Sequence, residues 1–146
     1  MKNLIVQSDS FKKLRKITVH QAVNALSTKL NFKVNSMGIN FVSVEDIIRI
    51  NKAYLGHDYS TDIITFNYSS EIDTLDGEIY ISYTDALENS RKFGVKYSSE
   101  ILRLIIHGIL HMLGHNDIKT SEKRKMRLLE DKFLAELKYL EKNFLR

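Results

Sequence analysis

Residues 101–117 read ILRLIIHGILHMLGHND, and this stretch decides the fold expected of the chain. Its apolar residues surround a helix axis almost completely, which is typical of a buried helix rather than of an amphipathic surface helix. Ser98 and Glu100 precede it and are suited to begin a helix. We therefore expect a central buried helix, and the polar side chains set into it call for an explanation.

Two histidines in this stretch, His107 and His111, are four residues apart. On a helix they lie about 40° apart around the axis and one turn along it, so both imidazoles can reach one ion. Three protein ligands with a fourth position left open are typical of a catalytic metal site. The spacing therefore predicts two of the three ligands.

The third ligand has to come from beyond the helix. On a straight helix Asp117 would stand about 15 Å from His107, too far to share an ion. Gly114 can take the left-handed conformation that ends a helix, which would turn the chain back so that Asp117 meets the histidines. His115 also follows the break and is the alternative third ligand. We favour Asp117, and assign His115 to the substrate face or to the residues that surround the ligands.

Two other interpretations of this stretch are weaker. A lone histidine on an apolar helix is usually a satisfied core residue, but the composite spacing favours a metal site. Zinc peptidases of the His-Glu-x-x-His type carry a general base beside the first histidine, where this chain has Gly108, so a peptidase is not expected. Because glycine costs a helix about 1 kcal/mol relative to alanine, Gly108 should permit close packing or close approach of substrate.

Composition limits the class of protein. The 146 residues predict one domain, 1–146, and the 43% hydrophobic and 27% charged residues are typical of globular proteins. The absence of cysteine excludes a disulfide-linked partner and leaves nitrogen and oxygen to hold any metal. Without a signal-like start or an apolar run of roughly 20 residues, we expect a cytoplasmic protein with no membrane partner. The net charge of +4 favours a polyanionic partner such as RNA without requiring one.

The rest of the chain predicts a small sheet packed with helices. Alternating or β-branched segments indicate strands near residues 3–7, 37–43, 61–66 and 77–82. Apolar residues three or four apart indicate helices near residues 11–30, 44–54, 82–94, 98–113 and 126–144.

The motif HGxLHxxG that begins at His107, followed by Asp117 at the place of a third ligand, resembles that of the YbeY family of bacterial endoribonucleases. Segments 51–66 and 77–81 agree with the same family, so the resemblance covers nearly the whole chain. It implies an α+β, zincin-like fold in which a small mixed β-sheet of about four strands packs with helices around a central buried metal-binding helix.

The same resemblance implies a function. One zinc ion (Zn2+) per chain would be held by His107, His111 and Asp117, the residues on which catalysis depends. The substrate would be single-stranded RNA, cleaved during maturation of small-subunit (16S) ribosomal RNA and in ribosome quality control. The partners would be ribosomal RNA and the small ribosomal subunit.

Two positions depart from the family pattern. The third ligand is usually histidine, and Asp117 adds a negative charge near the ion, which should make a bound water less acidic. Leu55 stands where the family has an arginine. If that arginine binds phosphate, another base such as His57, Lys52 or Arg49 takes over its role.

The residues expected to bind substrate are His57, His115 and Lys119. A basic run follows the metal segment and can guide an RNA backbone toward it: Lys119, Lys123, Arg124, Lys125 and Arg127. The interspersed acids Glu122, Glu130 and Asp131 favour instead a plain solvated helix face.

The residues also leave other functions open. One is a non-catalytic ribosome-assembly factor with a structural metal, and another is a metal-dependent hydrolase of a different substrate. For an endoribonuclease, either water or the 2′-hydroxyl of the substrate can be the nucleophile, and no separate general base is evident in the sequence.

Overall fold

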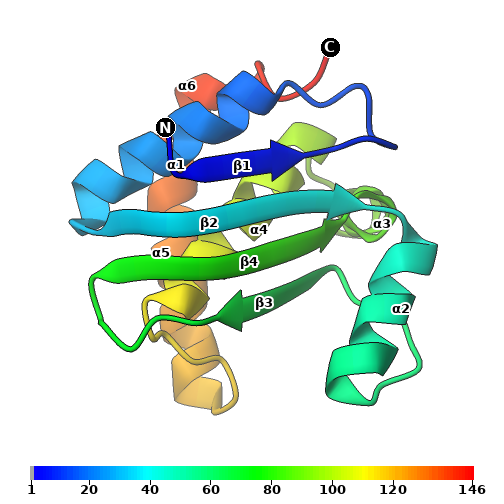
Figure 1. The fold of residues 1–146 in the computed structure, drawn as a ribbon. Helices are drawn as coiled ribbons and strands as arrows, with labels where there is room; N and C mark the ends of the chain where they lie inside the picture. The colour runs from blue at the N-terminus through cyan, green and yellow to red at the C-terminus, as the bar shows by residue number, and fades with distance from the viewer. Residues whose placement is uncertain (1) are drawn as a thin grey trace.

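The computed structural model describes residues 2–146 and shows a mixed sheet of four strands covered by helices (Figure 1). In chain order the elements are β1 (Leu4–Gln7), α1 (Lys16–Leu30), β2 (Lys33–Val42), α2 (Val44–Leu55), β3 (Ile63–Asn67), β4 (Thr74–Ser82), α3 (Tyr83–Phe93), α4 (Tyr97–Met112), α5 (Thr120–Glu136) and α6 (Lys138–Glu141). Within the described residues, no helix combines the length and the hydropathy that crossing a membrane requires.

The sheet has the strand order β1-β2-β4-β3. β1, β2 and β4 run parallel to one another, whereas β3 pairs antiparallel with β4 at the edge of the sheet. Helices α1, α4 and α5 lie behind the sheet in Figure 1, and α2 stands at one end of it. This arrangement confirms the α+β fold with a small mixed sheet that the sequence predicted.

Helix α4 is the central element of the core. Ten of its residues are buried, among them three consecutive ones, Leu104, Ile105 and Ile106. A Cβ atom at Gly108 would lie 2.8 Å from Ile79 Cδ1 and 3.1 Å from Ile63 Cδ1. Gly108 therefore allows α4 to approach β3 and β4 closely, which confirms the expectation of close packing there.

Several element boundaries differ from those predicted, and β4 and the C-terminal helix begin earlier than expected, at Thr74 and Thr120. The first helix begins at Lys16, because Phe11 and Leu14 reach the core from a turn and not from a helix. β2 begins four residues earlier than expected, at Lys33. The predicted C-terminal helix is divided at Leu137 into α5 and α6. Leu137 and the residues after it keep apolar spacing because they continue into the core, so periodicity alone did not show the break.

Gly77 leaves the space that β3 needs to pair with β4. Its replacement by alanine is expected to destabilise the protein by about 2–3 kcal/mol. A Cβ atom there would overlap the carbonyl oxygen of Phe66, a backbone atom that cannot move without breaking the β3–β4 ladder. Urea unfolding measures the loss. Gly38→Ala on β2 is the control, because its Cβ would lie 3.2 Å from the flexible end of Glu78. Equal losses in the two variants would contradict the prediction.

Candidate metal centre

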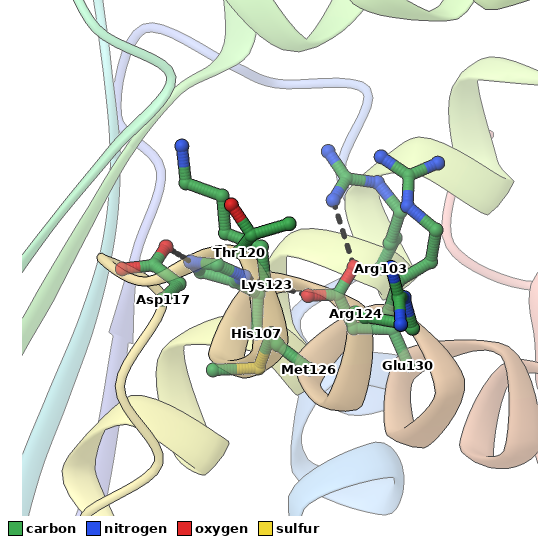
Figure 2. Close-up of a pocket in the computed structure, with 9 residues that line it drawn as sticks. Arg103, His107, Asp117, Thr120, Lys123, Arg124, Met126 and Glu130 are labelled. Atoms are coloured by element: carbon green, nitrogen blue, oxygen red, sulfur yellow. Dashed lines mark hydrogen bonds and ion pairs between the residues drawn. The ribbon is translucent and has the colours of Figure 1, made fainter.

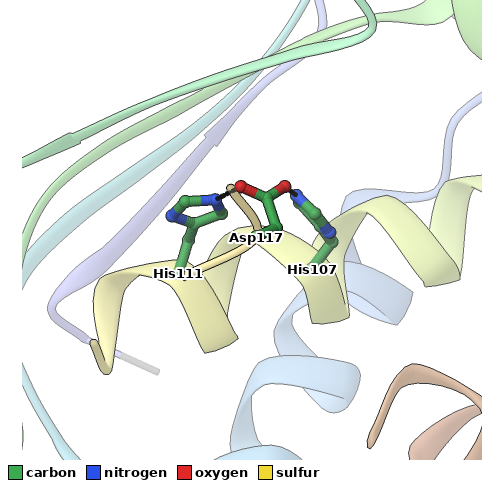
Figure 3. Close-up of side chains that lie close together, drawn as sticks. All are labelled: His107, His111 and Asp117. Atoms are coloured by element: carbon green, nitrogen blue, oxygen red, sulfur yellow. Dashed lines mark hydrogen bonds and ion pairs between the residues drawn. The ribbon is translucent and has the colours of Figure 1, made fainter. Parts of the chain in front are cut away.

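Three side chains converge at the end of α4: His107, His111 and Asp117 (Figure 3). The carboxylate of Asp117 lies between the two imidazole rings, with Oδ1 3.1 Å from His111 Nε2 and Oδ2 3.5 Å from His107 Nε2. One donor atom from each residue lies within 4.8 Å of the other two. The structure thus brings together the three residues that the sequence predicted as ligands.

The turn after α4 explains how Asp117 reaches the histidines. Gly114 has a φ of 99°, in the left-handed region predicted for it. Its N–H donates to the carbonyl oxygen of His111, and the N–H of His115 donates to that of Leu110, each at 3.0 Å. This pair of bonds is the Schellman arrangement that closes a helix end and reverses the chain. Asp117 therefore returns along α4 instead of continuing beyond it.

The spacing of the donor atoms suits a small divalent ion. Two ligands each about 2.0–2.1 Å from an ion in tetrahedral geometry are about 3.4 Å apart. Asp117 Oδ1 lies 3.1 Å from His111 Nε2 and the other oxygen, Oδ2, lies 3.5 Å from His107 Nε2, so each contact is close to this value. The side chains of His107, His111 and Asp117 are 16%, 31% and 36% exposed, so the cluster opens to solvent on one side. A group of this kind can hold a metal ion and leave a position free for water or substrate.

The buried carboxylate of Glu130 contacts His107 Nδ1, the ring nitrogen that is not directed toward Asp117. Glu130, on α5, has a side chain only 7% exposed, and its Oε2 lies 2.7 Å from His107 Nδ1. When Nδ1 carries the proton and donates a hydrogen bond to Glu130, the lone pair of Nε2 points toward Asp117 and the candidate ion site. Glu130 thereby fixes both the tautomer and the orientation of the His107 ring.

Glu130 also forms an ion pair with Arg103, which in turn pairs with Glu100. Arg103 donates from Nη1 to Glu130 Oε1 at 2.9 Å, and from Nε to the buried Glu100 at 2.8 Å. The hydrogen bond to Glu100 raises the pKa of Arg103. Burial alone would raise the pKa of Glu130, but the hydrogen bond with His107 and the ion pair with Arg103 outweigh it, and the net shift is downward. Glu130 is therefore a carboxylate at neutral pH, as an acceptor for His107 must be.

Sequence reasoning missed this supporting network, although two signals for it were present. Residues 100, 103, 107 and 111 follow one face of α4, where they form a polar stripe on an otherwise apolar helix. Glu130 occupies a core position of α5, between the buried Met126 and Phe133. A charged residue at such a position calls for a buried partner.

His115, the alternative third ligand, stands outside the cluster. Its backbone forms part of the turn after α4, and its side chain is not among the donors that meet. Burial lowers the pKa of His115, and the nearby Lys125 lowers it further.

The other residues predicted to bind substrate lie in two places. Lys119 is exposed directly after the cluster, where its backbone N–H begins α5 by donating to Glu122. His57 is exposed in the connection between α2 and β3, with its ring centroid 5.1 Å from that of Tyr59. Within the described residues, His57 is not part of the ligand cluster. Of the other bases near Leu55, Arg49 is already paired with Asp46 at 2.9 Å.

A cleft of about 440 Å³ lies beside the cluster, between α4 and α5 (Figure 2). The residues that line it include His107 and Asp117 of the cluster and the basic residues Lys123, Arg124 and Arg127 of α5. Part of the basic run that the sequence singled out therefore faces the candidate metal centre.

A second cavity of about 600 Å³ adjoins this cleft and shares Arg103, Arg127 and Glu130 with it. Asp62, at the start of β3, lines it and accepts a hydrogen bond from Asn89 at 3.0 Å. Burial raises the pKa of Asp62, and the positive charge of Arg103 only partly offsets this. Asp62 therefore keeps its proton to a higher pH than an exposed aspartate does.

A mixed sheet packed against a buried helix that carries candidate metal ligands is the architecture of zincin-like α+β proteins, and this chain has it. The sequence profile described as Endoribonuclease YbeY matches residues 2–138, and the chain belongs to that family. The resemblance inferred from the motif at His107 is thereby confirmed, and with it membership of a family of enzymes named as nucleases.

Individual relatives agree with this assignment. The chain is 38% identical over 122 residues to an Endoribonuclease YbeY of Bacteroides fragilis, an alignment that covers 84% of this chain and 87% of the relative. It is 34% identical over 136 residues to one of Porphyromonas gingivalis, covering 93% and 89%. The solution structure of a Thermotoga maritima protein matches the fold with a TM-score of 0.66 at 24% identity, covering 92% of this chain and 88% of that one.

Proposed function

We propose that this protein is a zinc-dependent endoribonuclease that cleaves single-stranded RNA in the maturation of small-subunit (16S) ribosomal RNA and in ribosome quality control. The observation that carries the proposal is the cluster of His107, His111 and Asp117, open to solvent beside a basic cleft. Membership of the YbeY family supports ribonuclease activity. The proposed role would bring the protein together with the small ribosomal subunit in the cytoplasm.

The choice of zinc rests on the donor set. Two imidazole nitrogens and one carboxylate oxygen, without a thiolate, suit zinc in a three-ligand catalytic site. When bound, the ion would stabilise negative charge on a phosphodiester oxygen and activate water or the 2′-hydroxyl of the substrate.

The chain's own residues contribute positioning and charge. His107 and His111 direct Nε2 toward the carboxylate of Asp117, and Glu130 favours the tautomer of His107 in which this nitrogen can bind an ion. The Asp117 carboxylate supplies the single negative charge among the three ligands. The half-buried position of the cluster limits access of bulk water, which strengthens electrostatic interactions with a phosphate.

The test is removal and restoration of the metal. The purified protein should contain close to one zinc per chain and should cleave single-stranded RNA but not the same sequence in a duplex. Treatment with a chelator should abolish cleavage, and stoichiometric zinc should restore it. Full activity of the metal-free protein would refute the proposal.

The cellular role needs a separate measurement. In cells that lack the gene, unprocessed ends of small-subunit ribosomal RNA should accumulate, and the wild-type gene should reverse this. Normal ends in such cells would refute the role in maturation while leaving the nuclease activity intact.

A further inference from the structure

Three cationic side chains line the cleft beside the cluster without a carboxylate partner. Lys123, Arg124 and Arg127 are exposed, and within residues 2–146 none of them lies at ion-pair distance from an acidic side chain. The ion pairs of the molecule involve other cations. Three positive charges therefore face the cleft without an ion-pair partner among the described residues.

Among the described residues, the acidic residues of α5 form no ion pair with these cations. Glu122 accepts the backbone N–H of Lys119 at 2.9 Å. Glu130 is divided between His107 and Arg103. Asp131 lines the adjoining cavity and not this cleft. The acids interspersed along α5 therefore leave Lys123, Arg124 and Arg127 without an ion-pair partner in residues 2–146, although the carboxylates of Asp117 and Glu130 also line the cleft.

The arrangement of the three cations suits a chain of phosphates. Lys123 and Arg127 are one helical turn apart, about 6 Å along α5, with Arg124 beside them. In Figure 2, Lys123 and Asp117 lie toward one end of the cleft, and Arg103 and Arg124 toward the other. The positive charge thus extends along the cleft from the ligand cluster instead of lying at one point.

The size of the cleft favours a single strand. Its volume of about 440 Å³ is near the lower end of the roughly 300–1,000 Å³ that small-molecule pockets occupy. Such a space suits a nucleotide or two of an unpaired strand. Guanidinium groups bind phosphate oxygens in a bidentate manner, and lysine adds a point charge.

We propose that Lys123, Arg124 and Arg127 bind the phosphates of single-stranded RNA next to the bond that is cleaved, so that α5 forms one wall of the RNA path. This inference rests on the proposed function and specifies how that site takes its substrate. These residues would also supply the phosphate-binding group that the resemblance places at an arginine and that this chain, with Leu55 on α2, lacks there.

The test compares two triple variants with the same loss of charge. In the cleft variant, Lys123, Arg124 and Arg127 are each replaced by glutamine. In the control variant, Lys132, Lys138 and Lys142 are replaced by glutamine, since these lysines are exposed but do not line the cleft. Binding of a fluorescent single-stranded RNA oligonucleotide is measured across a range of salt concentrations, together with zinc content, thermal unfolding and cleavage kinetics.

The cleft variant should show a slope of log K against log salt shallower by about 2, because each lost phosphate contact on a single strand accounts for about 0.7. Its KM should rise by about tenfold or more, whereas zinc content, melting temperature and kcat should stay close to wild type. The control variant should keep the wild-type slope.

If the cleft and control variants have equal slopes and the wild-type protein cleaves RNA, RNA binding by α5 is refuted and the proposed function stands. Conversely, a wild-type protein that cleaves no RNA but shows the expected difference in slope would refute the nuclease proposal and support the RNA-binding wall.

Discussion

Replacement of His111 by alanine should remove the metal ion and abolish RNA cleavage, while the protein stays folded. His111 supplies one of the three donor atoms, and the two that remain cannot complete a site of this class. We expect metal affinity to fall by more than about 100-fold, since even partners outside the ligand set account for 10–100-fold. The His111 side chain is 31% exposed, so its loss leaves no buried cavity. Zinc content after dialysis and cleavage of single-stranded RNA measure the two effects.

His115→Ala is the matched control, because His115 lies near the same turn but outside the cluster. It should retain zinc and cleave RNA. Loss of zinc in His115→Ala as well as in His111→Ala would mean that the third ligand is misassigned. An unfolded His111→Ala protein would instead indicate a structural metal, because removal of a structural ion takes folding free energy with it.

Replacement of Glu130 by alanine should destabilise the fold and weaken metal binding together. The change leaves His107 Nδ1 without its acceptor and removes one of the two carboxylates that hold Arg103. Breaking a buried ion pair from one side costs about 3–5 kcal/mol, and we expect about 3 kcal/mol because Arg103 keeps Glu100. Metal affinity should fall by about 10–100-fold, because the His107 ring is no longer oriented. Urea unfolding of the metal-free protein and competition with a zinc chelator separate the two losses.

Two further variants make this prediction specific. Glu136→Ala removes an acid of the same helix that pairs with Lys29 at 3.6 Å and is 37% exposed, so it should cost less than about 1 kcal/mol. Glu130→Gln keeps an oxygen acceptor for His107 and should recover part of the lost metal affinity. A Glu130→Ala protein as stable as Glu136→Ala would show that the network does not hold the site.

The parts of the molecule that could be predicted from sequence follow from local rules. Apolar residues all around one helix indicate burial, and Gly114 permits the left-handed turn that its measured φ confirms. The approach of Asp117 to His107 and His111 follows from these two facts. The ligand cluster could therefore be predicted from the sequence, because all its members lie within a stretch of 11 residues.

The supporting parts of the site depend on long-range packing and could not be placed in the same way. Glu130 reaches His107 across 23 residues and Arg103 across 27, and only the docking of α5 on α4 brings them together. Phe11 and Leu14 are three residues apart and both enter the core from a turn, so their spacing resembles that of a helix. Likewise, the charge alternation along α5 suggested neutrality, whereas Glu122 and Glu130 are in fact engaged with other partners.

The Schellman turn at Gly114 divides the ligand set between two parts of unequal rigidity. Two ligands sit on the most deeply packed helix of the chain, whereas the third sits on an exposed turn whose direction depends on one backbone torsion. Substitutions in this turn can therefore alter the fit of the third donor without disturbing the packing of the core. A change of donor at this position would therefore disturb the fold less than a change at His107 or His111.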